Sequence, residues 1–314
     1  MRIYSGKRNP LFFSLLLREV RYNTQKDFPP LESLPPERAA PVKKTALRIG
    51  ISRYGRWLIL IAFFAILLFG LWATPPGLLG KADAIGYAVC HRIDLRSFHL
   101  GNRQLPLCAR CTGTFLGVII GVAILIVAGR GRTIAWPRRS LFAVLVLTAV
   151  PWGFDGVNSY LYLFPGLPHL YTPQNWLRLT TGTFLGLAMA AVFLPAVNQS
   201  LWKTGSPVPV LKNFRELVLY FLAAPVLIVL VLLENPIILY PLALLSTMGV
   251  LYLLTGVYTS ILLMLFRKEN FAETFHDAWP VLVAGLTIGL LQIMAIDIVR
   301  FYFTHTWGGF NLGG

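Results

Sequence analysis

The sequence predicts an all-α, polytopic transmembrane helix bundle with about seven spans. Three observations support this prediction: 56% of the 314 residues are hydrophobic, only 13% are charged, and long apolar runs alternate with polar segments. Most of these runs have the roughly 17–25 residues that a helix needs to cross ~30 Å of hydrocarbon. The chain therefore has too little polar surface for a soluble globular protein.

The expected spans divide the chain into three parts. Residues 1–56 are expected to form a basic, largely disordered cytoplasmic tail, because they mix charges and prolines. Residues 57–197 are a four-span membrane core, and residues 198–314 add three spans. The spans run from Trp57 to Ala73, Cys111 to Ala128, Leu141 to about Phe164, Trp176 to Val197, Leu217 to Leu233, Ile238 to Phe266 and Ala278 to about Phe303.

Basic residues set the expected orientation. Of the 28 Lys and Arg residues, 21 fall before the first span or in loops on the same side of the membrane. The positive-inside rule then places the N-terminus in the cytoplasm and the C-terminus outside. Because these charges crowd the ends of apolar runs, the expected partners are membrane lipids, and no nucleic-acid partner is expected.

The hexamer TGTFLG occurs twice, at Thr112 to Gly117 and at Thr181 to Gly186, each near the outer end of a span. Small residues continue at every fourth position in both spans, a pattern that lets two helix backbones approach closely in lipid. We therefore expect the second and fourth spans to touch. Two similar hairpins, formed by spans one and two and by spans three and four, would make an internal repeat.

All three cysteines lie in one segment, CHRIDLRSFHLGNRQLPLCARC, which is expected on the extracytoplasmic side. Cys108 and Cys111 flank the start of the second span, where the helix dipole favours thiolates. With Cys90 and His91 they supply three sulfurs and one imidazole, a set that suits tetrahedral Zn²⁺ or another transition metal. Adjacent side chains rarely converge on one ion, so in this hypothesis either Cys90 or His91 binds the metal while the other has a different role. His99 is then a substitute ligand.

The same cysteines allow a different chemistry. A C-x-x-C pair with lowered thiol pKa values at the mouth of a helix bundle is typical of membrane thiol–disulfide oxidoreductases. Quinone-coupled systems of that kind relay electrons through a second cysteine pair, whereas Cys90 stands alone. The residues by themselves leave the metal and redox hypotheses open.

Polar residues deeper in the bundle indicate a second cluster. A carboxylate such as Asp155, about fourteen residues into the third span, is costly in a membrane unless it is paired. Arg178 is its expected partner, with Asn158 and Asn175 as hydrogen-bonding neighbours, and together these four residues would line a polar cavity. The pair either joins two helices or belongs to a functional site.

The last span carries a further pair of opposite charges. Asp297 and Arg300 are three residues apart, so their side chains can meet on one face of a helix. We expect an intrahelical ion pair there.

The motifs CHR, RSF, LPLCARCTG, FDG and NWLRLTTG resemble, as a set, the signature of an uncharacterised family of prokaryotic integral membrane proteins, a domain of unknown function. The resemblance covers roughly Tyr87 to Ala190. It implies no activity, substrate or cofactor, but it marks a set of residues as important: Cys90, His91, Cys108, Cys111, Asp155, Asn175 and Arg178.

The leading hypothesis is therefore an integral membrane protein with a zinc-like site at its extracytoplasmic mouth. The alternatives are a thiol–disulfide oxidoreductase that uses Cys108 and Cys111, a transporter of a small solute or ion, and a structural subunit of a membrane complex. The sequence does not decide whether the protein is an enzyme, because it lacks the common catalytic and nucleotide-binding motifs.

Overall fold

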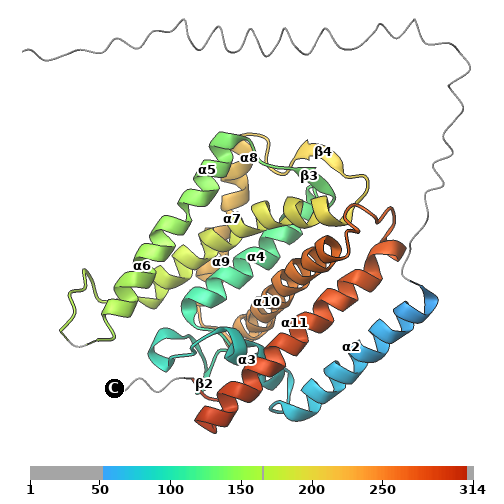
Figure 1. Cartoon of the computed structure of the whole chain (residues 1–314). Coiled ribbons are helices and arrows are strands. Elements are labelled where there is room, and N and C mark those ends of the chain that lie inside the picture. Colours follow the sequence, from blue (N-terminus) through green and yellow to red (C-terminus); the bar gives the residue numbers. More distant parts are fainter. Residues whose placement is uncertain (1–51, 165, 310–314) are drawn as a thin grey trace, which may run out of the picture. The chain divides into compact units, whose positions relative to one another are not determined.

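The computed structural model describes residues 52–164 and 166–309, which form a bundle of long helices (Figure 1). The predicted tail at 1–56 lies almost entirely outside the described residues. Seven helical segments in the described part are long and apolar enough to cross a membrane, which confirms the predicted class and the seven spans. Five of them are continuous helices: α2 (Arg53–Ala73), α4 (Ala109–Val127), α7 (Asn175–Leu201), α10 (Pro236–Leu265) and α11 (Phe275–Thr304).

The other two spans are each broken once. The third consists of α5 (Arg139–Leu147) and α6 (Ala149–Leu161), and the fifth of α8 (Phe214–Phe221) and α9 (Ala223–Leu232). A proline follows each break, Pro151 in α6 and Pro225 in α9, and its ring nitrogen cannot donate to the carbonyl four residues earlier. At the first break the hydroxyl of Thr148 donates to the carbonyl of Leu145.

The helices α4 and α7 lie side by side at the centre of the bundle (Figure 1). A Cβ atom on Gly113 would lie 2.4 Å from the carbonyl oxygen of Leu179. A Cβ atom on Gly186 would lie 2.0 Å from that of Thr114. Only glycine allows two backbones to approach so closely, which confirms the predicted contact between the two TGTFLG segments.

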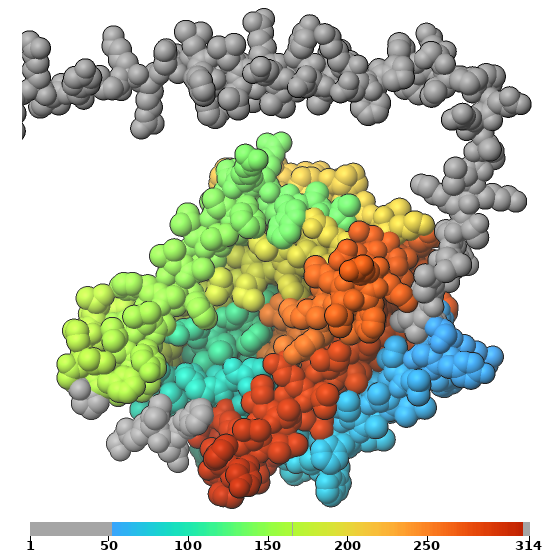
Figure 2. All heavy atoms as spheres, in the orientation of Figure 1, coloured from blue at the N-terminus to red at the C-terminus, as the bar shows by residue number. Residues whose placement is uncertain are grey.

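The first span lies elsewhere than predicted. α2 packs against α11 rather than α4, whereas α6 packs against α7, so the described contacts do not form two similar hairpins. Figure 2 shows α2 in blue on the surface beside α11 in red. In the apolar stretch of α2 none of the residues is buried, whereas 50% of the corresponding residues of α4 and 56% of those of α7 are buried. The exposed apolar side chains of α2 are suited to contact with lipid.

A short helix that the span pattern did not predict, α3 (Leu78–Val89), packs against α10 and α11 before the cysteine segment. It is followed by a 3₁₀ turn (Asp94–Arg96) and an antiparallel pair, β1 (His99–Leu100) and β2 (Arg103–Gln104). The strands β3 (Thr133–Ala135) and β4 (Ser206–Pro209) follow the C-terminal ends of α4 and α7 and pair with each other in parallel. The largest hydrophobic cluster of the described residues lies between α4, α5, α7 and α8 and includes Leu125, Leu141, Leu187 and Leu217.

Candidate functional site

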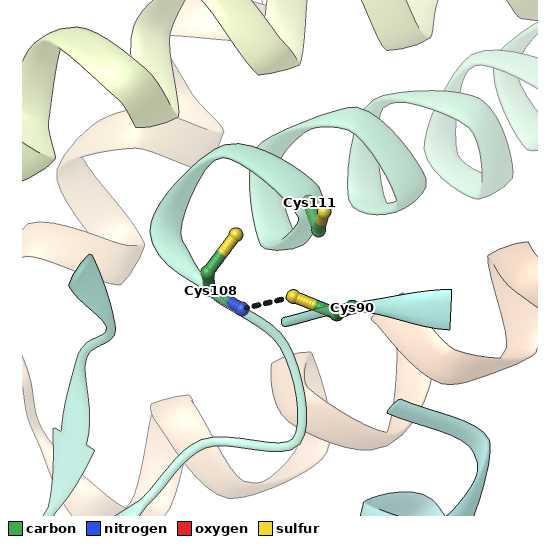
Figure 3. A group of neighbouring side chains, drawn as sticks. All are labelled: Cys90, Cys108 and Cys111. Carbon is green, nitrogen blue, oxygen red and sulfur yellow. Dashed lines mark hydrogen bonds between the residues drawn. The ribbon is translucent and has the colours of Figure 1, made fainter. Parts of the chain in front are cut away.

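Three cysteine sulfurs meet at the start of α4 (Figure 3). The Sγ atoms of Cys90, Cys108 and Cys111 all lie within 4.8 Å of one another. Cys90 and Cys108 are buried and Cys111 is half-buried. A tetrahedral Zn²⁺ with Zn–S bonds of about 2.3 Å requires sulfurs about 3.8 Å apart, so the three thiols need only small adjustments to share one ion.

The start of α4 places two of these sulfurs. Cys108 is the N-cap of the helix and Cys111 lies in its first turn. Residues three apart lie on the same side of a helix, so both thiols face the same neighbours, among them Val250 of α10. The partial positive charge at this helix end favours thiolates.

The third sulfur follows α3 and accepts hydrogen bonds from the backbone. The N–H group of Cys108 lies 3.4 Å from Cys90 Sγ, and that of Arg92 lies 3.5 Å from it. Arg92 has a φ of 50°, in the left-handed region, and this turn directs its N–H back to the sulfur. Donors of this kind stabilise the thiolate form, which is also the form that binds metals.

The neighbouring thiols change the acidity of the cluster. Hydrogen bonds from Cys108 and then Cys111 hold the pKa of Cys90 well below its ordinary value. The Cys111 thiol lowers the pKa of Cys108, but hydrogen bonding to Cys90 and burial outweigh this effect and raise it to about 12.

The last span positions the Cys90 segment. The guanidinium of Arg300 donates to the carbonyls of Cys90, at 2.7 Å, and His91, at 3.3 Å. It also donates to the carbonyl of Tyr87 and lies 3.9 Å from the centre of the Tyr87 ring. The predicted pair of Arg300 and Asp297 forms no hydrogen bond, because Arg300 extends to these carbonyls, but its charge still attracts the carboxylate.

The two histidines of the segment lie differently from the sulfurs. His91 Nδ1 is 3.5 Å from Cys90 Sγ, but His91 does not share the mutual 4.8 Å spacing of the three cysteines. His99 Nε2 lies 2.9 Å from a carboxylate oxygen of Asp94. His91 is thus the histidine that a ring rotation brings toward the sulfurs, while His99 has another partner.

Asp155 has a different partner from the one predicted. Its carboxylate forms an ion pair with Arg110, which lies between Cys108 and Cys111 in the sequence, and accepts a hydrogen bond of 2.8 Å from the Tyr171 hydroxyl. Burial, followed by this hydrogen bond, raises the pKa of Tyr171 to about 12, so the hydroxyl stays a donor. The predicted Asp155–Arg178 ion pair is wrong.

Three arginines surround Ser159 of α6. Arg110 and Arg178 lie 3.2 and 3.3 Å from its Oγ atom, and Arg96 donates to its carbonyl at 2.6 Å. Arg178 also donates to Asn175 Oδ1 at 3.0 Å. With one carboxylate among three guanidinium groups, this arginine cluster carries an excess of positive charge.

Asn158 lies at the edge of the arginine cluster. Its Oδ1 atom accepts from the N–H of Leu170 at 2.8 Å, and its Nδ2 atom donates to the carbonyl of Tyr171 at 2.9 Å. Asn175 donates to the carbonyl of Leu95 at 3.2 Å. Asn158 thus holds the loop that carries Tyr171, and Asn175 connects α7 to the 3₁₀ turn.

Residues 90–192 match a family described as predicted membrane protein, DUF2085. The match begins at Cys90 and includes every cysteine, the arginine cluster and both TGTFLG segments. Residues 90–192 are therefore similar to this family. The uncharacterized protein MJ1492 of Methanocaldococcus jannaschii is 26% identical over 120 residues, which cover 38% of this chain and 70% of the relative. No solved structure matches the chain.

Two residues that hold residues 90–192 in place lie outside the matched range. Sequence reasoning missed the first of them, and it considered the second only as a partner of Asp297. Asp83 of α3 is buried and accepts from Arg92 at 2.9 Å and from Arg103 at 2.5 Å. Arg300 of α11 is the other. A charged residue among the small side chains of α3 was the available signal for Asp83, whereas nothing in the sequence pairs Arg300 with carbonyls more than 200 positions away.

The charge balance of the arginine cluster predicts unequal effects of two neutralising variants. Asp155→Asn is expected to destabilise the protein by about 3 kcal/mol or more, because it leaves three guanidinium groups without their carboxylate. Arg110→Gln is expected to cost less, since Asp155 keeps the Tyr171 hydroxyl and the attraction of Arg178. Thermal unfolding of both variants in detergent measures the difference, and equal or reversed effects would contradict this account.

Proposed function

We propose that the segment 90–192 binds a transition-metal ion, with Zn²⁺ as the best fit, through Cys90, Cys108 and Cys111. The observation that carries the proposal is the convergence of three sulfurs within 4.8 Å from two segments separated by eighteen residues. His91 is the candidate fourth ligand, because its Nδ1 atom already lies 3.5 Å from Cys90 Sγ. Thiolate and imidazole ligands in this ratio favour zinc over hard cations such as Mg²⁺.

The surrounding charges support a thiolate-bound ion. Three thiolates and one Zn²⁺ have a net charge of −1, which is costly to bury without nearby positive charge. The guanidinium of Arg300 donates to the carbonyl of Cys90, and Arg92 and Arg110 each lie within two residues of a cysteine in the sequence.

Two observations favour a metal over a dithiol pair that cycles with its disulfide. A cycling pair needs only Cys108 and Cys111, yet Cys90 lies within 4.8 Å of both and accepts two backbone N–H groups. The arginine cluster is a separate question. Both oxygens of Asp155 are bonded within the chain, so this cluster is better explained as a clamp that holds α4, α6 and α7 together. We infer a structural or regulatory metal site as the first function to test.

The test is metal content together with the number of reactive thiols. We expect about one zinc per chain by elemental mass spectrometry of detergent-purified protein, with all three thiols unreactive until a chelator is added. Protein without metal and with one free thiol of three would overturn the proposal and favour the redox pair. Protein without metal and with three reactive thiols would also overturn the metal proposal.

The site is proposed to face the extracytoplasmic side, on the distribution of Lys and Arg described above. A C-terminal alkaline phosphatase fusion is then expected to be active in intact bacterial cells, and a C-terminal green fluorescent protein fusion to be dark. The matched control is an N-terminal fluorescent fusion, which is expected to fluoresce. The opposite pattern at the C-terminus would place the cysteines on the cytoplasmic side.

A further inference from the structure

A cavity of about 330 Å³ lies between the last turns of α2 and α11, away from the sulfurs and the arginine cluster. Its size is in the range of sites for small organic molecules. Its lining is mostly apolar and aromatic and includes one carboxylate; among the lining residues are Phe69, Met294, Phe301, Tyr302, Trp307 and Asp297.

The carboxylate of Asp297 accepts no hydrogen bond in the described part of the chain, although the charge of Arg300, one turn beyond it, attracts it. The residue is only 3% exposed, and neither of its oxygens accepts a hydrogen bond there. The other two buried aspartates, Asp83 and Asp155, are both paired with arginines. A buried carboxylate without a hydrogen bond is costly in a membrane-spanning helix, so such a residue indicates a missing hydrogen-bonding partner.

The charged side chains near this cavity bond to other groups. Arg300, one turn beyond Asp297, donates to carbonyls of the Cys90 segment. Lys81 donates to the carbonyls of Leu71 and Thr74 at the end of α2. These bonds hold both cations at the backbone and leave the carboxylate facing the cavity.

The rest of the lining favours an organic cation over a metal ion. Asp297 is the only acidic residue of the lining, whereas hard metal ions need several oxygen ligands. Phe301 and Trp307 stack with ring centres 5.4 Å apart and, with Phe69 and Tyr302, offer aromatic surface. Aromatic rings beside a carboxylate are a suitable environment for an ammonium group with alkyl substituents.

We propose that this cavity binds a monovalent organic ammonium ion, with Asp297 as its counter-ion and the aromatic side chains in contact with its alkyl groups. The ligand is either a free small amine or the head group of an amine-bearing lipid. This proposal does not depend on the metal site.

The test compares choline with its uncharged analogue 3,3-dimethyl-1-butanol by isothermal titration calorimetry on the full chain in dodecyl maltoside. We expect saturable choline binding and at least about tenfold weaker binding of the alcohol. Asp297→Asn, which keeps the side-chain shape, is expected to weaken choline binding about tenfold or more, and Phe301→Leu to weaken it several-fold. The unfolding temperature of each variant establishes that it is folded.

Equal affinity for the two compounds, unchanged affinity in Asp297→Asn, or no choline binding at millimolar concentrations would overturn the proposal. The same titration in nanodiscs of phosphatidylglycerol, with and without phosphatidylcholine, distinguishes the two sources of the ligand. Competition by phosphatidylcholine assigns the cavity to a lipid head group, and unchanged choline affinity assigns it to a free amine.

Discussion

Replacing Cys111 with serine is expected to reduce bound zinc from about one ion per chain to a small fraction of that value. Serine has nearly the same shape, but its hydroxyl is a much poorer ligand for zinc than a thiolate. Cys111 is also the only half-buried member of the three, so its replacement disturbs packing least. Elemental mass spectrometry of the purified variant gives the zinc content directly.

Val250→Ala is the matched control for this variant. Val250 of α10 is buried against the same cysteines but offers no ligand atom. We expect it to lower stability by about 0.5–1.5 kcal/mol or somewhat more and to retain the metal. Full zinc content in Cys111→Ser, or equal loss of zinc in both variants, would argue against ligation by Cys111.

The variant Gly186→Ala is expected to cause a large loss of stability for the addition of a single methyl group. The added Cβ atom would lie 2.0 Å from the Thr114 carbonyl oxygen and 3.0 Å from the Gly117 Cα atom, both of them backbone atoms. The methyl group therefore forces α4 and α7 apart, at a cost of about 1–3 kcal/mol or more. Thermal unfolding of the purified protein in detergent measures this loss.

Gly153→Ala provides the comparison for that experiment. Gly153 lies in α6, and a Cβ atom there would meet nothing within 4 Å. Alanine is the better helix former, so we expect unchanged stability or a gain of up to about 1 kcal/mol. An unfolding temperature of Gly186→Ala that equals that of Gly153→Ala would show that the two helices are not in tight contact.

The sequence was sufficient for the spans and for the central contact of the fold. Apolar length decides where a helix crosses the membrane, and the two TGTFLG segments identify the two closest helices. The position of α2 could not be predicted in this way. Its apolar surface is compatible with any neighbour, and its contact with α11 depends on a helix more than 200 residues away in the chain.

The convergence of the sulfurs could also be predicted from the sequence, because two of them lie within one helical turn. The partners of the charged residues were not. Asp155 could pair with any arginine at the same end of the bundle, and the choice of Arg110 over Arg178 depends on the relative rotation of α4, α6 and α7. The function of Arg300 depends on the turn at Arg92, which presents the carbonyls of Cys90 and His91 to α11.

The most direct test of a sulfur-bound metal is X-ray absorption at the zinc K-edge on the purified, full-length protein. The account predicts a first shell that contains three sulfurs at about 2.3 Å, with one nitrogen at about 2.0 Å if His91 completes the site. In His91→Ala the three sulfurs are expected to remain and the nitrogen to be lost. A shell of nitrogen and oxygen atoms without sulfur would contradict the assignment of Cys90, Cys108 and Cys111 as ligands.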